Sequence, residues 1–248
     1  MNLFSIFTEL FKTLWWLLPL VFVLALAQTP WFKGFLGELL VRFAIKLKLN
    51  KDEYQALHNV TLRTLDGTTQ IDHVLISKFG IFSIETKNYS GWIFGGQYQK
   101  VWTQKLFKKT FKFQNPLHQN FKHLKALEAL LSVPQDKIHS VIVFVGGSTF
   151  KTEMPPNVRT VTDFIQYIES KNTQVFSMEE VVAIKNKLLG GRMTPNLATN
   201  KEHVANLQKR KDPNSERKCP RCGSRVISRC PVTRTKPDNS ALTTSQAR

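Results

Sequence analysis

Residues 70–88 constrain the fold of this chain more than any other segment, because they predict a hairpin whose register can be deduced. Two runs rich in Val, Ile and Phe flank the segment Ser77-Lys78-Phe79-Gly80. This is the pattern of two antiparallel strands joined by a tight turn. If Ile76 pairs with Ile81, each residue of the first strand has one defined partner on the second. The sequence therefore predicts which side chains meet across the hairpin.

Three charged residues are expected on one face of this hairpin. The register places Asp72 opposite Glu85, and the alternation of side chains along a strand puts Lys87 on the same face. Facing carboxylates repel, and a chain that keeps such a pair commonly neutralises it with a cation or by protonating one member. Oxygen ligands of this kind favour Mg²⁺ or Mn²⁺. A solvated salt-bridge cluster is the alternative interpretation.

A metal held by the two carboxylates would suit one kind of chemistry. Lys87, two residues after Glu85, could polarise a phosphate or position an attacking water beside the ion. The strands are otherwise apolar, and a lone ionised carboxylate there is unfavourable, so the shared face is expected to line a cleft. The pattern therefore favours metal-assisted hydrolysis of phosphodiesters.

Several short motifs follow one another around the hairpin. They are Gly37-Glu38, Gln70-Ile71-Asp72-His73, Gly80-Ile81-Phe82, Ile84-Glu85-Thr86-Lys87-Asn88 with Gly91, and Asn115-Pro116-Leu117-His118-Gln119-Asn120. An Asp followed on the next strand by Glu-x-Lys resembles the metal-binding core of the restriction-endonuclease-like nucleases. Together the motifs resemble the nuclease-related domain (NERD) family, from about Gly34 to about Leu131.

The resemblance implies a site of five residues, namely Glu38, Asp72, Glu85, Lys87 and Gln119. Asp72 and Glu85 would hold the metal, and Lys87 would be the charged catalytic partner. Glu38 and Gln119 would face the same site from their helices. Glu38 is also favoured near a helix start by the helix dipole alone, and Gln119 shares with His123 a helix face that could meet the cleft or solvent. His73 points away from Asp72 and is expected to be structural.

The N-terminal segment predicts a membrane anchor. Residues 13–32 carry no charge, and a helix of about 20 residues can cross about 30 Å of hydrocarbon. Trp and Phe residues mark both ends, and basic residues follow the segment. This arrangement predicts one pass through the inner (cytoplasmic) membrane, with the main domain in the cytoplasm. A cleaved signal peptide is the alternative, suggested by Ala25-Leu26-Ala27 before Gln28.

The formal net charge of +17 indicates polyanionic partners, either nucleic acid or the anionic inner leaflet of a membrane. One run of lysines interleaves with aromatic residues, a pattern suited to binding phosphates while the aromatic rings stack on bases or rest in the membrane interface. The candidate nucleic-acid-binding residues are Lys105, Lys108, Lys109 and Lys112, interleaved with Trp102, Phe107, Phe111 and Phe113. A solvated basic face on a strand pair is the alternative.

The remaining sequence predicts one main domain and a short tail. A buried strand is expected over residues 138–145, and a capping box at residues 177–180 starts a later helix. We expect an anchor at 1–33, a nuclease-related domain at 34–192, a linker at 193–218 and a tail at 219–248. The tail holds Cys219, Cys222 and Cys230, which resemble part of the zinc ribbon of type IA topoisomerases. A structural Zn²⁺ site needs four ligands, so this ribbon is either degenerate or completed by His203 or another subunit.

The expected fold is α/β, a restriction-endonuclease-like mixed sheet flanked by helices and preceded by one transmembrane helix. The expected function is a membrane-anchored, divalent-metal-dependent nuclease that acts at the cytoplasmic face on DNA, with RNA as a less favoured substrate. A non-catalytic, membrane-tethered nucleic-acid-binding protein is one alternative. A membrane-associated structural or signalling protein is the other. The sequence does not specify the oligomeric state.

Overall fold

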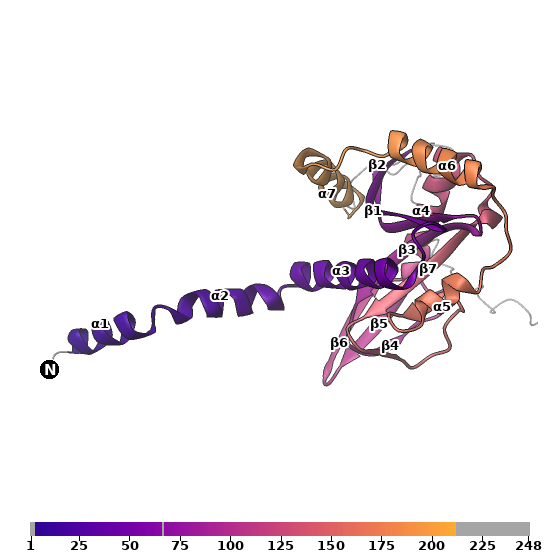
Figure 1. Cartoon of the computed structure of the whole chain (residues 1–248). Coiled ribbons are helices and arrows are strands. Elements are labelled where there is room, and N and C mark those ends of the chain that lie inside the picture. The colour runs from indigo at the N-terminus through magenta and orange to yellow at the C-terminus, as the bar shows by residue number, and fades with distance from the viewer. Residues whose placement is uncertain (1–2, 66, 212–248) are drawn as a thin grey trace, which may run out of the picture.

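The computed structural model describes residues 3–65 and 67–211 and contains two mixed sheets flanked by helices, with an N-terminal helical arm (Figure 1). The helices are α1 (Leu3–Leu14), α2 (Leu17–Gln28), α3 (Pro30–Lys48), α4 (Pro116–Leu131), α5 (Phe164–Glu169), α6 (Met178–Gly191) and α7 (Leu197–Lys211), with a 3₁₀ turn at Gln135–Lys137. The strands are β1 (Tyr54–Thr64), β2 (Gly67–Ser77), β3 (Gly80–Asn88), β4 (Gly91–Phe94), β5 (Val101–Leu106), β6 (Lys109–Gln114), β7 (Ile138–Val145), β8 (Ser148–Phe150) and β9 (Val158–Thr160).

The first sheet contains the hairpin deduced from the sequence. Its strand order is β1-β2-β3-β7-β9. β2 and β3 are antiparallel, and Ile76 pairs with Ile81, which confirms the predicted register. β3 then pairs in parallel with β7, the strand expected over residues 138–145. The hairpin strand β3 therefore lies at the centre of the sheet.

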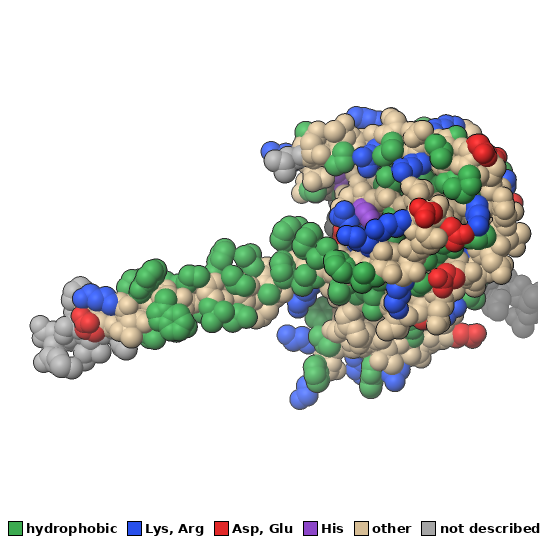
Figure 2. All heavy atoms as spheres, viewed as in Figure 1, with side chains coloured by type: hydrophobic (Ala, Val, Ile, Leu, Met, Phe, Trp, Pro, Cys, Tyr) green, Lys and Arg blue, Asp and Glu red, His purple; other side chains and the backbone are tan. Residues whose placement is uncertain are grey.

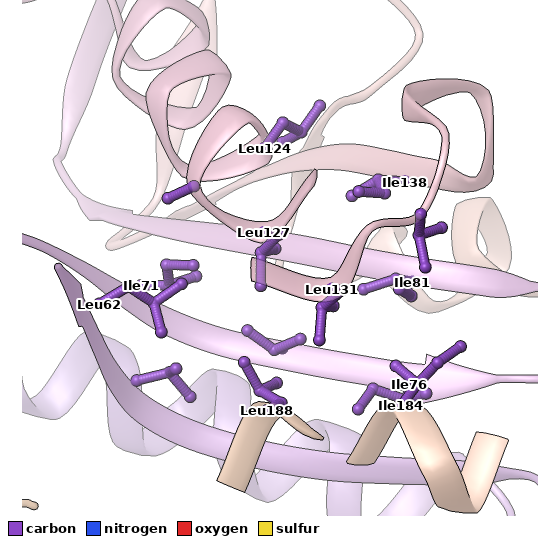
Figure 3. Close-up of a cluster of buried hydrophobic side chains, with 14 of the residues drawn as sticks. Leu62, Ile71, Ile76, Ile81, Leu124, Leu127, Leu131, Ile138, Ile184 and Leu188 are labelled. Carbon is purple, nitrogen blue, oxygen red and sulfur yellow. The ribbon is translucent and has the colours of Figure 1, made fainter. Parts of the chain in front are cut away.

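Hydrophobic clusters on both faces of this sheet fix the helices. α4 and α6 cover one face through residues that include Leu127, Leu131 and Leu188 (Figure 3). α3 covers the other face through Val41 and Ile45, beside α5. Burying one aliphatic side chain of this size contributes about 1.5–3 kcal/mol. This packing sets the position of α3 and α4 relative to β3.

The prediction of a single sheet is corrected by a second sheet, with the order β6-β5-β4-β8. β3 and β7 are parallel, and the strands that follow them, β4 and β8, are parallel as well. Gly91 and Gly146 have positive φ values at the turns between these strands, a conformation that favours glycine. Trp102 of the second sheet stacks on Phe144 of the first. The glycine turns therefore lead both strands into a second layer.

The single transmembrane helix expected over residues 13–32 is not formed. Among the described residues no one helix is long and apolar enough to cross a membrane, and only α2 and α3 taken together, bent by 72°, have the required length and composition. Pro30 has no backbone N–H, so it cannot continue the hydrogen bonding of α2 and instead starts α3. The Thr29 side chain caps α3 by accepting a hydrogen bond from the Phe32 N–H at 3.3 Å. α2 itself has 12 residues and is about 18 Å long.

The later elements largely follow the prediction. The capping box starts α6, since Ser177 Oγ accepts from the Glu180 N–H and the Glu180 carboxylate accepts from the Ser177 N–H. Within the segment expected to be a linker, residues 197–211 form α7, which packs on β2. The three cysteines at 219, 222 and 230 lie outside the described residues, so zinc binding stays a prediction.

A histidine pair joins β1 to β2. His58 Nδ1 and His73 Nδ1 are 2.8 Å apart, so one ring donates a hydrogen bond and the other accepts it. Burial and then Arg42 lower the pKa of His58 to about 4. Burial, then His58 and Arg42, lower the pKa of His73 to about 3. Both rings are therefore neutral at physiological pH, which is consistent with a structural role for His73.

We expect the fold to lose stability as the pH falls from about 6.5 to about 4, because the unfolded chain then protonates both histidines while the folded protein does not. The loss should be on the order of 2 kcal/mol, less than the shifts imply, because His58 is partly exposed. Urea unfolding across this pH range measures it. The His58→Gln/His73→Gln variant should show a flatter dependence, and an unchanged slope would exclude the pair as the cause.

Candidate active site

The candidate site begins where the pairing of β2 with β3 stops. The last paired residues are His73 and Ile84, one position before Asp72 and Glu85 would meet. Asp72 Oδ2 instead accepts a hydrogen bond from the backbone N–H of Thr86 at 2.7 Å. The predicted Asp72–Glu85 strand pair is therefore not formed, but burial and then the charge of Glu85 raise the pKa of Asp72, so the two carboxylates still influence each other. The Asp72 side chain thus replaces backbone pairing at the point where the strands separate.

Glu85 and Lys87 form a largely buried ion pair on β3. Lys87 Nζ donates to Glu85 Oε1 at 2.6 Å and to Gln119 Oε1 of α4 at 2.9 Å. The Glu85 side chain is 3% exposed and that of Lys87 is 17% exposed. Asn115 Oδ1 caps α4 by accepting from the Leu117 N–H at 2.9 Å, and Gln119 follows one turn later. The structure therefore brings Gln119 to the ion pair rather than to solvent.

His123 is a further partner of Glu85 that the predicted site did not include. Its Nε2 lies 3.1 Å from Glu85 Oε2, and its Nδ1 lies 2.8 Å from Thr69 Oγ1 of β2. His123 is buried and follows Gln119 by four residues on α4. The four-residue spacing was the sequence signal that His123 shares a helix face with Gln119. The sequence did not show whether that face meets the cleft or solvent. Both α4 side chains contact the Glu85–Lys87 pair.

Glu38 approaches the same site from α3, next to a glycine that makes the approach possible. A Cβ atom on Gly37 would lie 2.9 Å from Val145 Cγ2 and 3.0 Å from Asn88 Cβ. A larger residue would therefore push α3 away from the ends of β3 and β7. Burial and then the Glu85 carboxylate raise the pKa of Glu38, which places its carboxyl group within the field of the site. The Gly-Glu motif thus has a structural explanation.

The site holds more carboxyl groups than its one lysine can pair with. Burial, then the carboxylates of Glu85 and Glu38, raise the pKa of Asp72 well above its ordinary value. Burial is the largest single influence on the pKa of Glu85 and acts to raise it, but Lys87 and His123 together outweigh burial and the pKa is lowered. Burial is the largest single influence on the pKa of Lys87 and acts to lower it, but Glu85, Asp72 and Tyr89 together outweigh burial and the pKa is raised. Glu85 and Lys87 are therefore an ionised pair, and the remaining acidic groups are Asp72 and Glu38.

The donor chemistry of this site fits a hard divalent ion. Carboxylate oxygens are the ligands that Mg²⁺ and Mn²⁺ prefer, and a cation beside Asp72 would oppose the rise of its pKa. The geometry is less complete, because no group of three or more His, Cys, Asp or Glu side chains within 3–65 and 67–211 is arranged to hold a metal. Mg²⁺ commonly uses only one or two carboxylates, with water and substrate phosphates as its other ligands. Metal binding at Asp72 and Glu85 stays a prediction.

At about pH 7 the Asp72→Asn variant should be at least as stable as the wild type. We expect its free energy of unfolding to be higher by on the order of 1 kcal/mol. Because the folded pKa of Asp72 is raised, its contribution to stability is complete below the unfolded pKa of about 3.9 and is lost as the pH rises through the folded pKa. Asn removes that loss and keeps an oxygen for the Thr86 N–H. Urea unfolding in metal-free buffer measures the difference. A clear destabilisation would show that the charge of Asp72 supports the fold.

The four lysines expected to bind nucleic acid lie on the exposed hairpin of β5 and β6. They are Lys105, Lys108, Lys109 and Lys112. Phe107 at the turn is 92% exposed and Phe111 is 47% exposed. Trp102 is fully buried, and Phe113 packs against it. The expectation that all the interleaved aromatic residues could stack on bases is therefore wrong for Trp102 and Phe113, which hold the hairpin on the core.

Comparison with known proteins covers the region that holds these residues. Residues 33–145 match the family described as nuclease-related domain, which is the family that the motifs resemble. An uncharacterized protein of Bacillus anthracis is 50% identical over 105 residues, which are 42% of this chain and 49% of that protein. The chain thus spans about half the length of that relative. No solved structure matches the chain.

Proposed function

We propose that this protein is a divalent-metal-dependent nuclease that hydrolyses phosphodiester bonds in DNA, with RNA as the second substrate that the same chemistry allows. The observation that carries the proposal is the convergence of side chains from α3, β2 and α4 on the buried ion pair that Glu85 and Lys87 form on β3. The converging side chains are Glu38, Asp72 and Gln119. The nuclease-related domain at residues 33–145 supports this class of activity.

The position of each side chain suggests its role. Asp72 and Glu85 would hold Mg²⁺ or Mn²⁺, which supplies a Lewis acid for the phosphate. Lys87 keeps its proton, since Glu85 raises its pKa, and so presents a positive charge to the oxygens on which negative charge develops. Gln119 accepts a hydrogen bond from Lys87 and so orients the ammonium group. His123 holds the other oxygen of Glu85.

Incubating the full-length protein with labelled DNA and RNA, with and without Mg²⁺ or Mn²⁺, tests the proposed activity. We expect fragments only when the metal is added, and none from the Asp72→Asn variant, which should remain folded. Metal-independent binding without fragments would favour the non-catalytic nucleic-acid-binding protein. Equal cleavage by Asp72→Asn would exclude this site as its source.

We also propose that the hairpin of β5 and β6 binds the sugar-phosphate backbone. Trp92 of β4 lies beside it, with Lys105 Nζ 5.9 Å and Lys151 Nζ 4.8 Å from the centre of its ring. The ring is 47% exposed. The cluster therefore combines exposed ammonium groups with an exposed aromatic ring, as backbone-binding surfaces do.

Replacing Lys108 or Lys112 by Gln should weaken binding to all nucleic-acid sequences alike. Each lost phosphate contact should flatten the plot of log affinity against log salt by about 0.9 for duplex DNA. A salt series with the Asp72→Asn protein, which cannot cleave the substrate, measures the slope. Lys201→Gln, on exposed α7, is the matched control and should keep the parent slope. Unchanged slopes for Lys108 and Lys112 would remove the hairpin from the interface.

We further propose that residues 13–32 attach the protein to the inner membrane, with the body in the cytoplasm. α2 is uncharged throughout, and basic residues follow it. The full-length protein should stay with membranes through a carbonate wash, and protease should digest the body only from the cytoplasmic side. Release of a shortened chain that begins near Gln28 would instead support a cleaved signal peptide.

A further inference from the structure

α3 is apolar on two opposite faces, although only one of them packs against the protein. Gly37, Val41 and Ile45 face the first sheet and are buried. On the opposite side the spacing i, i+3, i+4, i+7 and i+11 forms one outward stripe, which we call the α3 stripe. Its residues and their exposed fractions are Leu36 38%, Leu39 40%, Leu40 54%, Phe43 55% and Leu47 72%. Such a contiguous exposed patch indicates a binding surface.

The exposed charged residues of α3, which lie beside the α3 stripe, are all basic. Lys33, Arg42, Lys46 and Lys48 are exposed along α3. Glu38 is the one acidic residue of this helix, and it lies on the side that faces the active site. Long basic side chains flanking an apolar stripe are typical of a helix that lies in the interface of an anionic bilayer. A second copy of this chain would bring like charges together and is disfavoured.

The stripe also continues the apolar surface of α2. Large hydrophobic side chains are exposed along α2, and Figure 2 shows hydrophobic atoms along the arm and again over α3 at the body, with Lys and Arg atoms beside them. α3 is bent by 72° relative to α2. If α2 enters the bilayer near its normal, α3 therefore lies close to the membrane plane.

We propose that the α3 stripe rests in the headgroup region of an anionic membrane and holds the nuclease-related domain against it. This inference rests on the proposed attachment of residues 13–32. Because α3 also packs on the first sheet, membrane contact would fix the orientation of the whole domain rather than leave it on a flexible tether. Glu38 lies opposite the stripe on α3, so the active site would face away from the lipid, toward the cytoplasm.

Depth-dependent fluorescence quenching tests the orientation. The full-length protein, with its three tail cysteines replaced by Ser, is labelled at Leu40→Cys or Phe43→Cys with an environment-sensitive dye. It is reconstituted into vesicles of phosphatidylcholine and phosphatidylglycerol that carry a lipid-borne quencher. Val182→Cys on α6, where the side chain is 53% exposed, is the matched control. We expect the lipid quencher to reduce emission at 40 and 43 and a water-soluble quencher to reduce emission at 182.

Two further measurements separate the possible outcomes. Carbonate extraction of the same vesicles reports attachment by residues 13–32 independently of α3. If the protein resists extraction but only the water-soluble quencher reduces emission at positions 40 and 43, the α3 proposal is overturned and the anchor is supported. Protein that is extracted overturns both. Self-quenching between copies labelled at 43, without quenching by lipid, would assign the stripe to a dimer and also overturn the proposal. Leu40→Glu/Phe43→Glu, at exposed positions, should lose the lipid quenching of a dye at 47.

Discussion

Replacing Glu85 by Gln is expected to abolish detectable cleavage and to destabilise the fold by about 3 kcal/mol. Glu85 accepts from Lys87 at 2.6 Å and lies 3.1 Å from His123 Nε2, and its side chain is only 3% exposed. A neutral amide leaves the Lys87 ammonium largely buried without its counter-charge. It also removes one of the two proposed metal ligands. Urea unfolding and a cleavage assay with Mg²⁺ measure the two effects.

An exposed ion pair of the same type provides the control for Glu85→Gln. Lys125 Nζ and Glu128 Oε2 are 2.7 Å apart, with side chains that are 48% and 34% exposed. Glu128→Gln should therefore cost less than about 1 kcal/mol and leave cleavage unchanged. Equal destabilisation by the two substitutions would contradict the argument that burial makes the Glu85 pair important. Asp72→Asn should differ from both, since it loses cleavage without losing stability.

Replacing Lys87 by Met is expected to slow cleavage by about 10²–10³-fold while Mn²⁺ still binds. Lys87 donates to Glu85 and Gln119 and is proposed to stabilise charge on the phosphate, not to hold the ion. Removing the ammonium also frees the Glu85 oxygen that it contacts, so Mn²⁺ affinity should stay the same or increase. Single-turnover cleavage and Mn²⁺ titration of the same preparation measure the two properties separately.

The control for Lys87→Met is Lys78→Met, at the turn end of the same hairpin. Lys78 Nζ lies 2.7 Å from Glu53 Oε1, and both side chains are about one third exposed, at 31% and 38%. Its removal should change neither cleavage nor Mn²⁺ affinity. If Lys87→Met cleaves at the parent rate, the proposed role of Lys87 is wrong. If Mn²⁺ binding is lost together with cleavage, Lys87 supports the geometry of the site instead.

The site shows where local sequence rules were sufficient. A turn and the two-residue period of a strand determine the pairing of Ile76 with Ile81, and the structure has that pair. Helix starts were equally predictable, because the cap interactions of Asn115 and Ser177 involve only residues within the same turn. The nuclease-related motifs were recognisable for the same reason, since each is a short continuous segment.

Other features depend on contacts between segments that are distant in the sequence. His123 meets Glu85 only because leucines on α4 pack against the first sheet, and Glu38 reaches the site only because Gly37 lets α3 approach β3 and β7. Trp102 is buried and Phe107 is exposed, although both belong to the same run of alternating lysines and aromatic residues. The alternation of side chains along the sequence did not show which of the two would be buried.

The sequence by itself determined the strand register, the helix caps and the order of the charged motifs, because neighbouring residues decide these through backbone geometry and side-chain alternation. Only the tertiary structure decided which helix faces meet the sheet, since that depends on how the whole core packs. It also showed that the predicted membrane segment is interrupted at Pro30 and that α3 carries a second, outward apolar face beside its buried one. A hydrophobic residue of α3 has the same chemistry on either face, so the sequence could not assign it to the core or to the surface.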